Sequence, residues 1–151
     1  MTSHDVTHAT FTLEREYPVP PAEVFARWAE PAAKARWFAG PDTQHQLDFQ
    51  PGGVESLRAV HDGKVLTVES SYHNIVGDSR IVYSTTLCAD DTLATVSLTT
   101  VEFVPVEGGT RLVLTEQGTF LDGHEQPSWR EQGTSDQLAA LGAELAGTAA
   151  R

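Results

Sequence analysis

The chain has 151 residues, enough for one domain that buries about two thirds of the surface exposed by its unfolded chain. Acidic residues outnumber basic ones by 21 to 10, which gives a formal net charge of −11. Because this charge repels phosphate backbones and anionic lipid headgroups, we expect no nucleic-acid partner and no membrane insertion. The first residues lack the pattern of a secretory signal, and no segment approaches the ~18 apolar residues that span a bilayer. We therefore expect a cytoplasmic protein.

The N-terminal part of the chain predicts a strand followed by two short helices. Residues 1–7 are expected to form a flexible tail in front of a single domain over residues 8–147. From residue 9 to residue 17 apolar and polar side chains alternate, as in a strand with one wet face. Pro21 then suits the first turn of a helix, and Pro31 starts a second helix that ends before Gly40.

The remainder of the chain predicts six strands and one long helix. Residues 43–120 are rich in β-forming residues, and turn signals interrupt them at Pro51-Gly52-Gly53, Asp62-Gly63, Gly77-Asp78, Asp90-Asp91 and Gly108-Gly109. Residues 126–146 change to a helical period, with Gly147 expected just past the helix end. One stripe of this helix holds Thr134, Leu138, Leu141 and Leu145. The fold class is therefore α+β, in the order β, two short α, six β, long α.

Five short motifs within residues 8–146 carry a family resemblance. They are Pro20–Phe25, Trp37–Pro41, Pro51–Gly53, Gly108–Leu112 and Thr115–Gly118. In their order and spacing the chain resembles the SRPBCC (START-like) superfamily, and in particular the branch named after the C-terminal domain of the activator of heat-shock-protein-90 ATPase. The resemblance implies a helix-grip fold, in which a curved seven-stranded antiparallel sheet wraps the C-terminal helix. It also implies a cavity between them, which different members use for lipids, polyketides, hormones or other apolar compounds.

One position departs from the pattern of many relatives. They carry Gly-Trp near the middle of the last helix, whereas this chain has Gly133-Thr134. A small hydroxyl in place of a bulky ring predicts a roomier and more polar cavity. The other expected cavity residues are Trp37 and Phe38 beside the mouth, Tyr83, Leu112 and Leu114 on the sheet, and Leu138 and Leu141 on the helix. For the two aromatics at the mouth, closing the core is an alternative role.

Glu116 raises a question of its own, because strand alternation places it in line with Leu112 and Leu114. A buried carboxylate is costly unless it is paired. It could reach solvent if Gly118 marks a bulge at which the alternation slips. It could instead face the cavity, where Arg130, another inward base or a hydroxyl such as that of Tyr83 would satisfy it. Arg130 lies in the same angular sector of the helix as Thr134. Both alternatives remain open from the sequence.

No catalytic signature accompanies these residues. The chain lacks Gly-x-Ser-x-Gly, a phosphate-binding glycine loop and paired cysteines, and His124-Glu125 lacks the second histidine of a zinc helix. We therefore predict no metal, no cofactor and no catalytic residue. The sequence favours a protein that binds a small apolar molecule of lipid or polyketide type, and it does not determine the oligomeric state. The alternatives are a cyclase or hydrolase with Glu116 as general base, a chaperone-associated interaction module, and sequestration of a toxic metabolite.

Overall fold

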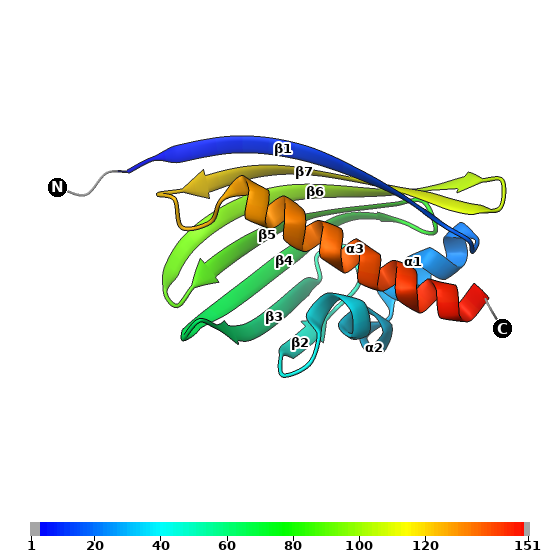
Figure 1. Cartoon of the computed structure of the whole chain (residues 1–151), viewed down its shortest axis with the longest axis horizontal. Coiled ribbons are helices and arrows are strands. Elements are labelled where there is room, and N and C mark those ends of the chain that lie inside the picture. The colour runs from blue at the N-terminus through cyan, green and yellow to red at the C-terminus, as the bar shows by residue number, and fades with distance from the viewer. Residues whose placement is uncertain (1–3, 150–151) are drawn as a thin grey trace.

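The computed structural model describes residues 4–149 and shows an α+β fold in which one long helix lies across a curved sheet (Figure 1). The seven strands are all antiparallel to their neighbours, in the order β1-β7-β6-β5-β4-β3-β2. The strands are β1 (Val6–Tyr17), β2 (Gln44–Leu47), β3 (Val54–His61), β4 (Lys64–Val76), β5 (Arg80–Ala89), β6 (Thr92–Val106) and β7 (Gly109–Leu121). The helices are α1 (Pro21–Ala29), α2 (Pro31–Lys34), the π-helical turn η1 (Ala35–Ala39) and α3 (Pro127–Ala149).

The predicted order of elements is confirmed, and two boundaries differ. β1 begins at Val6, which pairs with Leu121, because β7 is long enough to extend the ladder into the expected tail. Residues 1–3 of that tail lie outside the described residues. α3 continues through Gly147 to Ala149, so the expected end of the helix was wrong. A glycine ends a helix where the backbone turns left-handed, and Gly147 does not have a positive φ.

The hairpins follow local backbone chemistry. Asp62 and Gly63 form the two-residue loop between β3 and β4, with φ values of 50° and 76°. A two-residue hairpin of type I′ needs positive φ at both positions, and aspartate followed by glycine tolerates that conformation best. This turn therefore sets the β3–β4 register, in which Val60 pairs with Val65.

The second half of α3 closes the core against the sheet. Leu138, Leu141 and Leu145 are at most 1% exposed. Tyr17, at the end of β1, donates a hydrogen bond of 2.9 Å from its hydroxyl to the backbone carbonyl of Leu138. This half of the helix is therefore fixed by apolar packing, and any open space must lie beside its first half. In the described part of the chain, no helix is long and apolar enough to cross a membrane.

Candidate functional site

A pocket of about 250 Å³ lies between the first half of α3 and the inward face of the sheet. From η1 and the sheet its wall takes Trp37, Phe38, Tyr83, Leu114 and Glu116, and from α3 it takes Arg130, Thr134 and Leu138. All of these were expected at a cavity from the sequence. Two other expected residues, Leu112 and Leu141, lie in the closed core and do not reach the pocket wall. They sit where the sheet and the helix are already packed together, so they support the pocket without lining it.

Glu116 points toward the interior and is 6% exposed. β7 keeps a regular register against both β1 and β6 through this position, so the alternation does not slip. Gly118 is not a bulge. A Cβ at that position would lie 2.7 Å from the ring of Phe120, so the glycine makes room for that ring. The carboxylate of Glu116 pairs with Arg130, at 2.8 Å from Oε2 to Nε.

Three inward hydroxyls of β6 support this ion pair. Thr99 donates to Oε1 of Glu116 at 3.0 Å, and Ser97 accepts from Nη2 of Arg130 at 2.9 Å. Thr95 donates to Oε1 of Glu125 at 2.5 Å, and the same oxygen lies 3.5 Å from Nη1 of Arg130. Alternate residues of one strand face the same side, so Thr95, Ser97 and Thr99 form a row beneath the charged groups. The polar end of the pocket is thus one connected network.

The charges in this network keep Arg130 ionised. Burial acts to lower the pKa of its guanidinium, but Glu116 and Glu125 outweigh that effect, so the pKa lies above its usual value. For Tyr83, whose ring also lines the pocket, burial and then the Glu116 carboxylate raise the pKa well above the usual range. Tyr83 therefore offers a neutral hydroxyl to the pocket at physiological pH.

Gly133 and Thr134, the departure from the relatives' pattern, both line the pocket. Apart from its chain neighbours and the backbone of its own helix, no atom would lie within 4 Å of a Cβ on Gly133, so there is open space beside that position. Thr134 donates its hydroxyl to the backbone carbonyl of Arg130 at 2.9 Å. This bond to the preceding helical turn uses its only donor, so Thr134 presents mainly its methyl group and an acceptor oxygen to the pocket.

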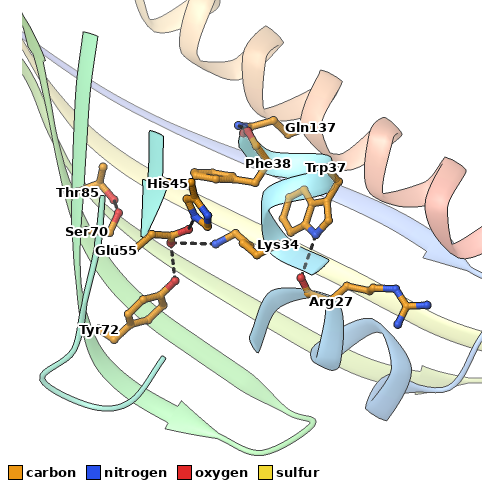
Figure 2. Close-up of polar contacts among 10 residues, drawn as sticks. All are labelled: Arg27, Lys34, Trp37, Phe38, His45, Glu55, Ser70, Tyr72, Thr85 and Gln137. Carbon is orange, nitrogen blue, oxygen red and sulfur yellow. Dashed lines mark hydrogen bonds and ion pairs between the residues drawn. The ribbon is translucent and has the colours of Figure 1, made fainter. Parts of the chain in front are cut away.

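A second buried network lies behind the aromatic wall of the pocket (Figure 2). Lys34 and Glu55 are 1% and 3% exposed and form an ion pair of 2.9 Å. Glu55 also accepts a hydrogen bond of 2.6 Å from the Tyr72 hydroxyl and contacts Nε2 of His45 at 2.7 Å. The ammonium of Lys34 lies over the ring of Phe38, 4.4 Å from its centroid. The sequence interpretation missed this network.

The network ties the segment that carries Trp37 and Phe38 to the sheet. Burial alone would raise the pKa of Glu55, but Lys34 and the hydrogen bonds from His45 and Tyr72 lower it to about 2. Burial also lowers the pKa of Lys34, and Glu55 opposes that change. Since three donors converge on Glu55, we take the pair as ionised at neutral pH. It joins the end of α2 to β3, and η1 follows directly after Lys34.

Two further residues at the pocket also escaped the sequence interpretation. Trp129 lines the pocket while 61% exposed, which places it at the rim. Glu125 lines the pocket from the turn before α3, where neither helical nor strand periodicity applies. Alternation along β6 could have revealed the row of inward hydroxyls. Among the described residues, no three His, Cys, Asp or Glu side chains come together in a way that could hold a metal ion.

Comparisons with known proteins place this geometry in a family. A protein from Rhizobium leguminosarum is 39% identical with a TM-score of 0.91, over 95% of this chain and 98% of its own. The Mll3558 protein from Rhizobium loti is 41% identical with a TM-score of 0.88, over 93% and 99%. Ara h 8.0201 is 18% identical with a TM-score of 0.74, over 93% and 99%, and shows the same helix-grip fold. No curated protein matches the chain.

The family described as "Activator of Hsp90 ATPase homolog 1-like protein" matches residues 18–146, which is most of the chain. The match begins at the end of β1 and ends within α3, so it includes the pocket and both buried ion pairs. The chain therefore belongs to this family, within the SRPBCC-type helix-grip proteins.

Proposed function

We propose that this protein binds a small, mostly apolar molecule in the pocket between α3 and the sheet. The observation that carries the proposal is the composition of the wall, where aromatic and aliphatic side chains meet one buried polar network at the α3 start. Ligand sites of proteins combine apolar walls with a few fixed polar groups in this way. A volume of about 250 Å³ favours a compact molecule over a long acyl chain.

The fold supports the same proposal, because proteins of this type commonly bind hydrophobic ligands. The outer face of the sheet gives less support to a protein-binding module. Val96 and Leu98 are each 40% exposed on β6, but their cross-strand neighbours on β5 and β7 are polar: Thr86, Ser84, Thr119 and Gln117. An interaction surface would be expected to present a contiguous apolar patch.

Binding of a neutral probe, 2-(1-naphthyl)ethanol, tests the proposal by titration calorimetry. Thr134→Trp puts a ring into the pocket and should weaken binding at least tenfold. Ala140→Trp adds the same ring on an exposed position of α3 and should leave affinity unchanged. Equal affinities for both variants, or no binding to the unmodified protein, would refute the proposal. Native mass spectrometry of protein isolated from its own host would then identify the natural occupant.

A further inference from the structure

The guanidinium of Arg130 is engaged by the protein itself on all three nitrogens. Nε contacts Glu116 at 2.8 Å, Nη2 donates to Ser97 at 2.9 Å, and Nη1 lies 3.5 Å from Glu125. A ligand carboxylate approaching this site would meet two protein carboxylates already paired with the same cation. Like charges in a weakly solvated space repel strongly. Arg130 is therefore a poor receptor for an acidic ligand, although it is the one cation on the pocket wall among the described residues.

The charges around the pocket sum to an excess of one negative charge. Glu116 and Glu125 face the single cation of Arg130, while Lys34 and Glu55, behind the aromatic wall, cancel each other. Both contacts of Glu125 are to its Oε1 atom, and within the described part of the chain no donor contacts Oε2. Its side chain is 14% exposed and lines the pocket. One carboxylate oxygen is thus available to a donor from the ligand.

An aromatic ring lines the same pocket as this carboxylate. Trp129 precedes Arg130 in α3 and lines the pocket from its exposed rim. An indole face attracts a cation within about 6 Å of its centroid, and more strongly than the other aromatic rings. The protein already holds one ammonium in this way, because Nζ of Lys34 lies 5.1 Å and 5.6 Å from the ring centroids of Trp28 and Trp37.

From these observations we propose that the ligand of the pocket is an amine: an apolar body with one protonated nitrogen, which Glu125 binds and the Trp129 ring faces. This inference rests on the proposed function and adds the chemical class of the ligand. It predicts that the pocket discriminates against carboxylic acids, fatty acids included. The excess negative charge attracts the ammonium, and the apolar wall receives the body of the molecule.

Three probes with the same naphthyl body test the inference by titration calorimetry at pH 7. They are 2-(1-naphthyl)ethylamine, 2-(1-naphthyl)ethanol and 1-naphthylacetate, which are cationic, neutral and anionic. We expect the amine to bind at least tenfold more tightly than the alcohol, and the acid to bind most weakly. Glu125→Gln, which keeps an acceptor oxygen for Thr95, should reduce amine affinity about tenfold and reduce alcohol affinity by a clearly smaller factor, because only the amine loses a charge–charge attraction. Glu131→Gln, the same change at an exposed position of α3, serves as the control.

The outcomes separate the inference from the proposed function. If the acid binds as tightly as the amine, or if Glu125→Gln leaves amine affinity unaltered, the inference is wrong while pocket binding stands. If none of the three probes binds, the proposed function fails and the inference fails with it. The alcohol reports whether the pocket of a variant is intact. Should Glu125→Gln not fold, the ranking of the three probes on the unmodified protein still decides.

Discussion

The buried Lys34–Glu55 pair allows a quantitative prediction of stability. Glu55→Gln keeps the shape of the side chain but removes its charge, which leaves the ammonium of Lys34 at 1% exposure with aromatic rings and an amide as its surroundings. Removing one partner of a buried pair costs about 3–5 kcal/mol. The pKa of Glu55, lowered from 4.5 to about 2, gives an independent figure. At 1.36 kcal/mol per unit it corresponds to roughly 3 kcal/mol.

A double-mutant cycle with Lys34→Met separates the pair from the rest of the network. Lys34→Met should cost less than Glu55→Gln, because Tyr72 and His45 still donate to the remaining carboxylate. The double variant has no uncompensated ammonium. The double variant should therefore lose about 2 kcal/mol less free energy of unfolding than the two single variants lose together.

Urea unfolding followed by circular dichroism provides the measurement, with unchanged m-values as the sign that only stability has changed. Glu69→Gln, the same substitution at an exposed position of β4, should stay within about 0.5 kcal/mol of the unmodified protein. A loss below about 1 kcal/mol for Glu55→Gln, or simple addition of the two single losses, would refute a strongly coupled pair.

Other predictions follow from burial and ionisation. Because its folded pKa is depressed, Glu55 stabilises the protein above pH 4.5, and this contribution is lost as pH falls toward 2. Between these pH values the free energy of unfolding should therefore decrease less steeply for Glu55→Gln than for the unmodified protein. Leu141→Ala, at 0% exposure, should cost about 2–5 kcal/mol in urea unfolding, and a loss below about 0.5 kcal/mol would contradict its core position. Glu116→Gln should fold, because Glu125 still faces Arg130, and should alter mainly which naphthyl probe binds best. If the protein is instead an enzyme with Glu116 as base, turnover of its substrate would fall by about two to four orders of magnitude.

The sequence predicted those parts of the site that depend on periodicity. Alternation along β7 put Glu116 in line with Leu112 and Leu114, which made an inward position one of its two alternatives, and the helical period placed Arg130 and Thr134 in one sector of α3. Both inferences need only the local geometry of one element. Contact between Glu116 and Arg130 then follows from the fold, since α3 is the element that covers the inward face of the sheet.

The missed residues depend on contacts between elements. Lys34 belongs to a four-residue helix, and its partner Glu55 lies 21 positions later on a strand, so no local pattern joins them. A lysine and a glutamate are expected at the surface unless they are paired, and pairing cannot be read from composition. Trp129 lies at the start of α3, ahead of the leucine stripe, and its ring lines the rim of the pocket.

The two halves of α3 explain why a pocket persists in a folded core. From Arg130 to Leu141 the helix advances roughly 16 Å. At one end leucine side chains bring helix and sheet into contact, whereas at the other the guanidinium spans the gap to Ser97 and Glu116. Closing that gap by apolar collapse would break charge-assisted hydrogen bonds and leave buried charges unpaired. The free energy lost in this way exceeds the free energy gained by burying the apolar wall of a small pocket. The polar network therefore holds the pocket open.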